Sequence, residues 1–331
     1  NEALDYQTGL CCAAFLWDIT DSGLSLELTA LIDEFHGHDD VSRAAQSSFE
    51  DVRLATVRFW QNKLHEGLAI KGDLHVGSTH PIELTTLYST CRVNLLTLTD
   101  DAEVHPGPTN YDHSWIRDAS ISCFATALAG DRRVAERQID EVFLKKQWHN
   151  RYLRARKALC KDKKGNDRYY NIDYCGFFGG DKEKHHNEWD ANGQAIWTIG
   201  VLDRIYPGFG LPRLGRVLEG VEWIGKHLVS HYSSKDELLP PGWSAEHLGR
   251  SDRRYFWDNF WALGGLQEAA RLAERNKLSK EKDYIWSLHQ RLKIEIARSV
   301  ETTIKFLRRN NFQDIFIPAS PDQEFDEQLQ S

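Results

Sequence analysis

Methionine is absent from the 331 residues of this chain. Ordinary usage of roughly 2% would give about seven. Two explanations fit: a protein that uses no methionine, or a sequence from which methionines are missing. We favour the second, so the spacings discussed below are minimum values.

Long apolar runs, paired cysteines and an excess of basic residues are also absent. No stretch approaches roughly 18 uninterrupted apolar residues, and no basic-then-apolar leader opens the chain. The 41 Lys and Arg residues face 49 Asp and Glu, a formal net charge of −8. This balance argues against nucleic acid or a membrane surface as partner. The six cysteines form no C-x-x-C pair, which is typical of buried thiols in a reducing compartment, so we favour a cytoplasmic protein.

Cofactor and metal motifs are equally scarce. There is no G-x-G-x-x-G or P-loop, so a nucleotide cofactor has no support. The run 185–190 (HHNEWD) places two histidines near two acids. Adjacent histidine side chains usually diverge, however, and no H-E-x-x-H or Cys/His spacing accompanies them. We therefore expect neither a metal nor a cofactor.

Two regions differ in their hydrophobic pattern. In residues 1–45, short apolar or alternating runs flank Asp21-Ser22-Gly23, which predicts a β-rich segment, such as the remnant of a β-sandwich domain. From residue 46 to 331 a 3.6-residue period takes over. It predicts helices around 52–64 and 84–98, and over 115–129, 131–147, 190–206, 213–231, 255–275 and 279–310.

Three of these helices open with the same local pattern. Irregular stretches at 99–112, 160–188 and 233–254 run into Trp115-Ile116-Arg117-Asp118, Glu188-Trp189-Asp190 and Trp257-Asp258. The aspartates are 72 and 68 positions apart, an internal repeat of roughly 70 residues with two helices per unit. Repeated helix pairs form a solenoid or, when closed, an α/α toroid. A single Trp-Asp pair would be an ordinary hydrophobic anchor and an N-terminal acid, but three favour a shared mouth.

Carboxylates interleaved with indole rings suit a sugar. A pyranose stacks its C–H face on Trp, while carboxylates and guanidinium groups bind its hydroxyls. Glycoside cleavage needs two carboxyl groups, one to protonate the leaving oxygen and one to act as base or nucleophile. The loop ends supply both kinds of residue: Asp112, Arg117, Asp118, Glu188, Asp190, Glu246, Asp252 and Asp258, with Trp115, Trp189, Trp243, Trp257 and Trp261.

These motifs resemble those of a known superfamily. Residues 106–118 (PGPTNYDHSWIRD) resemble the six-hairpin (α/α)6 glycosidases, most closely glucoamylase-like and glycogen-debranching-like bacterial proteins related to glycoside hydrolase family 15. Residues 188–194 (EWDANGQ) look like the acidic motif that heads an inner helix in that superfamily. Residues 239–247 (LPPGWSAEH) and 255–261 (YFWDNFW) resemble a third block, and the likeness spans roughly 50–320.

The resemblance implies roles for individual residues. Arg117 and Asp118 would hold sugar hydroxyls, with Trp115 as a wall of the subsite. The general acid would be Asp190 or Glu188, and we prefer Asp190, which faces the repeat axis as Asp118 does. Apart from the resemblance, we take Glu246 as the candidate second catalytic carboxylate, with His247 orienting it or binding a hydroxyl; the alternative is that Glu246 is a solvated loop acid. The predicted substrate-binding set is completed by Trp189, Trp243, Trp257 and Asp258.

The resulting hypothesis is a glycoside hydrolase that cleaves an α-linked glucan or oligosaccharide, by inversion if the resemblance holds. A six-hairpin toroid has twelve helices and the pattern predicts eight, so an incomplete ring is one expectation. The late hairpin that carries the base in glucoamylases is also unaccounted for. A non-catalytic carbohydrate-binding or regulatory toroid therefore remains open. So does a polysaccharide lyase, sugar epimerase or phosphorylase on the same fold, and the oligomeric state stays undetermined.

Overall fold

Helices account for most of the described chain, and this confirms the prediction of a mainly α protein. The computed structural model describes residues 48–70, 75–76, 82–100, 102–106, 114–146, 148–149, 152–153, 158–161, 167–170, 188–230, 237–242, 253–309 and 316–321. The predicted β-rich segment 1–45 lies outside these residues, as do Trp243, Glu246 and His247. The chain divides into two units, residues 1–62 and 63–331.

The described part of the first unit is the start of helix α2 (Phe49–Glu66). Ser48 precedes the helix, and its hydroxyl accepts a hydrogen bond from the backbone N–H of Asp51 at 3.2 Å. The same hydroxyl donates to the Asp51 carboxylate at 2.7 Å. This reciprocal contact satisfies one of the N–H groups that a helix start leaves unpaired. It also explains why helical spacing begins at this point in the sequence.

All eight predicted helical segments are helical in the described residues, and seven of them form α-helices. After α2, the α-helices are α3 (Leu84–Thr97), α4 (Ile116–Leu128), α5 (Arg132–Arg137), α6 (Asp190–Ile205), α7 (Leu214–Ser230), α8 (Phe256–Arg275) and α9 (Ser279–Arg309). The segment predicted as one helix over 131–147 is divided, because α5 continues as a π-helix, η3 (Gln138–Lys146). A short 3-10 turn, η4 (Leu211–Arg213), leads into α7. Within the described chain, no helix has the length and apolar character that spanning a membrane requires.

Four short antiparallel strand pairs are present in the described residues, and two of them reach into stretches that were predicted to be irregular. The pairs are β1 (His75–Val76) with β2 (Ile82–Glu83), β3 (Thr99–Asp100) with β4 (Glu103–Val104), β5 (Trp148–His149) with β6 (Tyr152–Leu153), and β7 (Ala158–Lys161) with β8 (Asp167–Tyr170). In the longest pair Ala158 lies opposite Tyr170 and Lys161 opposite Asp167. Two predicted loops, 99–112 and 160–188, therefore contain strand residues near their beginnings.

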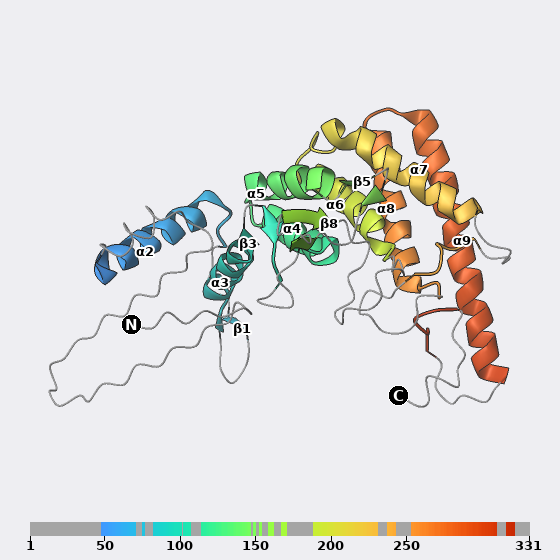
Figure 1. Cartoon of the computed structure of the whole chain (residues 1–331), viewed down its shortest axis with the longest axis horizontal. Helices are drawn as coiled ribbons and strands as arrows, with labels where there is room; N and C mark the ends of the chain where they lie inside the picture. The colour runs from blue at the N-terminus through green and yellow to red at the C-terminus, as the bar shows by residue number, and fades with distance from the viewer. Residues whose placement is uncertain are drawn as a thin grey trace. The chain divides into compact units, whose positions relative to one another are not determined.

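Three helices that open with the repeated motif lie side by side in the second unit (Figure 1). Helix α6 packs against α4 on one side and against α8 on the other. Most of its residues are buried, including Ile196, Ile199 and Leu202. Helices α7 and α9 pack on α8, and α5 packs on α4. The hydrophobic core lies between these helices, and it fixes the three motif-bearing helix starts relative to one another.

Helices α6 and α8 touch through their backbones. A Cβ atom built on Gly265 would lie 2.6 Å from the Gly193 carbonyl oxygen, and one on Gly193 would collide with the Trp261 carbonyl. Further along, a Cβ on Gly200 would meet the Glu268 Cβ at 2.5 Å. Both contact pairs, 193 with 261 and 200 with 268, have the 68-residue offset of the repeat. Equivalent residues of two repeats therefore lie beside each other on parallel helices.

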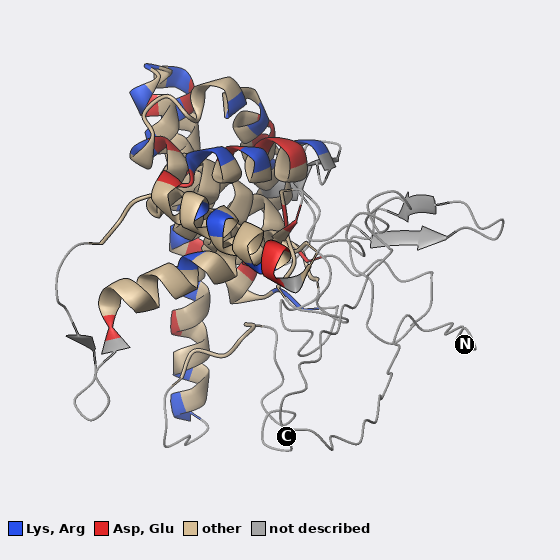
Figure 2. Ribbon diagram, turned by 90° about the vertical axis from the view of Figure 1, so that its left-hand side faces the viewer, with Lys and Arg blue, Asp and Glu red and all other residues tan. Residues whose placement is uncertain are grey.

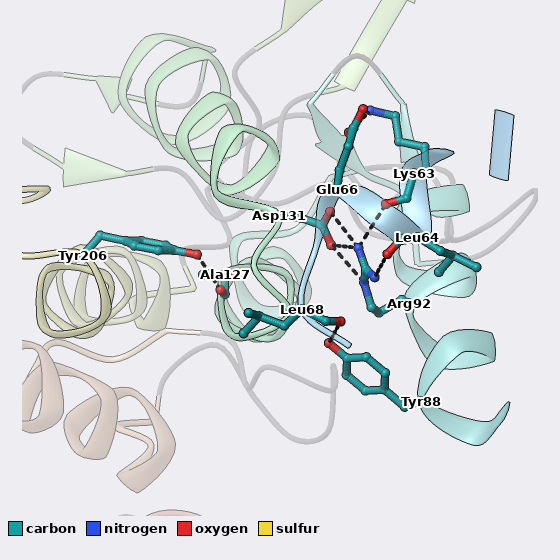
Figure 3. A network of polar contacts seen from close by, with 9 residues as sticks. All are labelled: Lys63, Leu64, Glu66, Leu68, Tyr88, Arg92, Ala127, Asp131 and Tyr206. Carbon is teal, nitrogen blue, oxygen red and sulfur yellow. Dashed lines mark hydrogen bonds and ion pairs between the residues drawn. The ribbon is translucent and has the colours of Figure 1, made fainter. Parts of the chain in front are cut away.

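A buried ion pair anchors the other end of this unit (Figure 3). Arg92 of α3 is 3% exposed, and its guanidinium donates to both carboxylate oxygens of Asp131, at 3.0 and 2.9 Å. It also donates to the backbone carbonyls of Lys63 and Leu64 at 3.2 and 2.9 Å. These carbonyls belong to the last turn of α2, where helix oxygens have no intrahelical partner. One arginine thus satisfies a buried acid and a helix terminus together.

Candidate functional site

The N-terminal ends of α4, α6 and α8 meet at Asp190. Arg117, in the first turn of α4, donates from Nη1 to Asp190 Oδ2 at 2.9 Å and to Glu188 Oε2 at 3.2 Å. Trp257, in the first turn of α8, donates its indole N–H to the same Asp190 oxygen at 2.8 Å. One side chain from each repeat therefore enters a single hydrogen-bonded cluster.

Buried aromatic residues set where two of these helices begin. Trp115 and Tyr255 immediately precede α4 and α8, both in extended backbone, and they are 4% and 2% exposed. Each anchors the chain in the core one residue before the helix, which places an aspartate in its first turn. A negative side chain there is stabilised by the unpaired N–H groups and the helix dipole.

Asp190 is the best-anchored acid of the cluster. Its side chain is 1% exposed, and Oδ2 accepts hydrogen bonds from Arg117, from Trp257 and from Gln194 Nε2 at 3.0 Å. Charge-assisted bonds of this kind are stronger than neutral ones. Its other oxygen, Oδ1, has no hydrogen-bond partner among the described residues. Asp190 therefore offers one saturated oxygen and one that is open for a donor.

Arg117 is the cationic member of the cluster. Burial lowers the pKa of its guanidinium, but the carboxylates of Asp190 and Glu188 outweigh this effect and raise the pKa above its ordinary value. The guanidinium also lies 5.4 Å from the centre of the Trp115 ring, within the range of a cation–π contact. Arg117 thus stays charged and is held between an aromatic face and two carboxylates.

Asp258 differs from the other two acids. It is 1% exposed, and neither of its oxygens has a hydrogen-bond partner among the described residues. Burial raises the pKa of Asp258 well above its ordinary value. The charges of Asp190 and Glu188 raise it further, and Arg117 opposes them. The site therefore holds three acids in two distinct environments.

The predicted tryptophans lie in three different surroundings. Trp115 is buried beneath Arg117. Trp189 donates its N–H to the Pro241 carbonyl at 3.1 Å and packs its ring 5.3 Å from that of Trp223 on α7. Trp257 is 41% exposed, with its ring edge-on to Trp261 at 5.9 Å. Of these three residues, Trp257 is the most exposed, as a side chain that stacks on a ligand must be.

Most predicted site residues that the structure describes are brought together. Arg117, Glu188, Asp190 and Trp257 share hydrogen bonds, and Asp258 feels their charges. Asp118 lies partly exposed in the first turn of α4, and Trp189 is directed toward α7 and Pro241. Trp243, Glu246 and His247 lie outside the described residues, so their place in the site stays a prediction.

Sequence reasoning missed Gln194, which donates to Asp190 from one turn further along α6. The signal was available, because residues at i and i+4 face each other on a helix. It also missed the Pro241 carbonyl that receives the Trp189 N–H. That contact joins segments 52 residues apart, and no local pattern reports it.

Charges elsewhere on the described helices are mixed. Lys and Arg are interspersed with Asp and Glu along these helices in the view of Figure 2. Within the described part of the chain, no group of three His, Cys, Asp or Glu side chains is arranged to hold a metal ion. Among the described residues, the site cluster is distinctive in setting three acids around the guanidinium of Arg117. No family model matches the chain, and the search of curated proteins finds no match.

Proposed function

We propose that this protein is a glycoside hydrolase that cleaves an α-linked glucan or oligosaccharide with a pair of carboxyl groups. The observation that carries the proposal is the cluster in which Arg117, Asp190 and Trp257, one from each repeat, share hydrogen bonds. It combines an exposed indole ring with buried carboxylates, the pairing that recognises a sugar by its apolar face and its hydroxyls.

We assign different roles to Asp190 and Glu188 from the contacts that each carboxylate makes. Asp190 is held by three donors on Oδ2, which suits an anion that binds hydroxyls through its open oxygen. Glu188 shares the Arg117 guanidinium at the longer distance of 3.2 Å, against 2.9 Å for Asp190. A general acid must carry a proton before the reaction, and contact with a guanidinium favours the ionised form of a carboxyl group. Glu188, which has the longer contact with Arg117, is therefore the better candidate of the two acids.

An α/α toroid is the architecture we propose around this site. Supporting it are three parallel motif-bearing helices, α4, α6 and α8, that pack side by side and alternate in sequence with helices packed against them. The common offset of 68 residues between α6 and α8 is what a ring of repeated hairpins requires. The resemblance to six-hairpin glycosidases implies inversion at the anomeric carbon, and the described helices would form part of such a ring.

The test is hydrolysis by the purified chain and three variants. Glu188→Gln, Asp190→Asn and Trp257→Ala are compared with wild type for release of reducing sugar from maltooligosaccharides and amylose. Asp283→Asn, whose side chain is 73% exposed on α9, serves as the control. We expect loss of at least about 100-fold for the acid variants, as removal of a general acid typically gives, and an unchanged control.

Two outcomes would count against the proposal. Wild-type protein that binds glucan without turnover indicates a carbohydrate-binding protein. Turnover that survives in both Glu188→Gln and Asp190→Asn refutes the assignment of the acids. Where turnover occurs, NMR of the first product tests the stereochemistry, because inversion of an α-linkage releases the β-anomer first.

A further inference from the structure

Asp258 is a buried acid that no described donor reaches. Both of its oxygens lack a hydrogen-bond partner among the described residues, and its side chain is 1% exposed. An ionised carboxylate in such a place is strongly unfavourable. A carboxylic acid is far less so, because the neutral group is cheaper to bury and carries a donor of its own.

Asp190 lies at the equivalent position of the neighbouring repeat. Asp190 precedes Gly193 by three residues, and Asp258 precedes Trp261 by three residues. Gly193 of α6 and Trp261 of α8 are in backbone contact. Asp190 and Asp258 therefore lie at the same height along two adjacent parallel helices. Asp190 is also the acid that acts most strongly on Asp258. Its open oxygen, Oδ1, is an acceptor without a donor among the described residues.

The charges around this pair are unequal. Among the described residues, Asp190 and Glu188 raise the pKa of Asp258 by their charges, and Arg117 from α4 lowers it. Of the other segments packed near the start of α8, residues 237–242 bring Glu237, which is paired with Arg291 of α9 at 2.8 Å. Asp190 and Glu188 both accept from Arg117, whereas no described donor reaches Asp258. Asp258 is therefore the acid of the cluster that the neutral form suits best.

We propose that Asp190 and Asp258 share one proton at neutral pH, with Asp258 as the member that holds it and Asp190 Oδ1 as the acceptor. Asp258 is then a positioning residue, because its O–H fixes the second oxygen of Asp190 as Arg117, Gln194 and Trp257 fix the first. Two like acids held close together bind a proton between them more tightly than either alone. Loss of the proton at higher pH adds a negative charge beside Asp190 and weakens the arrangement around Arg117.

The proton can be seen without any substrate. Infrared spectra of the intact chain, recorded from pH 5 to 9, report the carbonyl stretch of a protonated carboxylic acid. We expect wild type to keep this band at pH 7, and Asp258→Asn to lose it. Asp283→Asn, which changes an exposed acid, should keep it. A wild-type spectrum without the band at pH 7, or a band that survives Asp258→Asn, overturns the proposal.

Thermal unfolding gives a second, independent readout. A group protonated in the fold and ionised in the unfolded chain makes stability fall as pH rises above its ordinary pKa of about 4. Asp258→Asn keeps a neutral donor and removes this loss. The variant should therefore have a Tm at pH 7 equal to or above that of wild type, with the difference shrinking toward pH 4. A variant that is less stable at pH 7 and recovers at pH 4 refutes the shared proton. Asp258→Ser, also uncharged, is used if the amide does not fold.

The consequence for catalysis rests on the proposed function. If the chain hydrolyses glucan, the alkaline limb of its pH–rate profile should move to higher pH or flatten in Asp258→Asn, because the amide has no proton to lose. An unchanged limb contradicts the positioning role. If no hydrolysis occurs, the infrared and unfolding measurements still decide the proton, so the two proposals can fail separately.

Discussion

Removing the guanidinium of Arg117 is the sharpest test of the cluster. The side chain is 16% exposed, and the two carboxylates it contacts, Glu188 and Asp190, are 0% and 1% exposed. Arg117→Met keeps the apolar stem and leaves both acids buried without their cation. Breaking a buried pair by removing one partner costs about 3–5 kcal/mol, because the remaining charge is uncompensated. This is a large part of a typical stability of about 5–15 kcal/mol.

The assay is urea unfolding of four proteins: wild type, Arg117→Met, Asp190→Asn and the double variant. If the pair is coupled, the double variant loses less than the sum of the single losses, by about 1–3 kcal/mol. The deficit of Arg117→Met should also depend on pH. Its orphaned carboxylates can be neutralised by protonation, so the loss is largest at neutral pH and shrinks as pH falls toward the ordinary carboxyl range.

Two results would refute this reasoning. A loss below about 1 kcal/mol for Arg117→Met would place the contacts in the class of exposed surface pairs. Additive losses in the double variant would show that Arg117 and Asp190 stabilise the fold independently. Arg117→Lys separates charge from shape, because an ammonium restores the charge without the planar donor fork. We expect it to recover part of the stability and little of the sugar binding.

Three further predictions follow from contacts elsewhere in the described chain. Gly265→Ala should lower the unfolding free energy by about 1–3 kcal/mol through overpacking against α6. Gly264→Ala, whose added Cβ would have its nearest contact at 3.8 Å, should stabilise α8 or leave its stability unchanged. The midpoints of urea unfolding compare the two variants. Arg92→Met should cost about 3–5 kcal/mol by leaving its buried carboxylate partner unpaired, and a loss under 1 kcal/mol contradicts this. Trp257→Phe keeps a ring but removes the donor to Asp190, so glucan affinity, measured by calorimetry, should fall less than in Trp257→Ala; equal losses would exclude stacking as the main contribution.

Helix positions were predictable because their cause is local. A 3.6-residue apolar period reports which face of a helix is buried, and stops such as Gly130-Asp131 and Pro207-Gly208 interrupt it. The division of 131–147 into α5 and η3 was missed, because a π-helix is a rare variant within an α-helix. The β7–β8 hairpin was missed because its strands are short and its sequence is charged.

The meeting of the three helix starts was predictable from the repeat, but the side-chain directions were not. Equal spacing of Trp-Asp motifs implies equivalent places in a repeated fold, and Arg117, Asp190 and Trp257 do share hydrogen bonds. The same spacing predicts that Trp189 faces the site as Trp257 does, yet the Trp189 ring packs against Trp223 of α7. That direction depends on the rotation of α6 about its axis, which is set by packing against α4 and α8 together. A single sequence does not encode that rotation in any local pattern.

The repeat also explains why the site needs one neutral acid. Parallel helices bring their positive N-terminal ends together, and an aspartate in each first turn complements its own helix. The starts of α6 and α8 bring Asp190 and Asp258 together by this symmetry, and Glu188 adds a third acid, whether or not the total charge suits the site. Arg117 compensates part of this negative charge. Its guanidinium contacts Asp190 of α6, the middle helix, which packs against α4 and α8. Asp258 is left with burial and two acidic neighbours, so a proton is the remaining way to balance its charge. The arrangement that makes three helix starts favourable one at a time thus creates a titratable group at their meeting point.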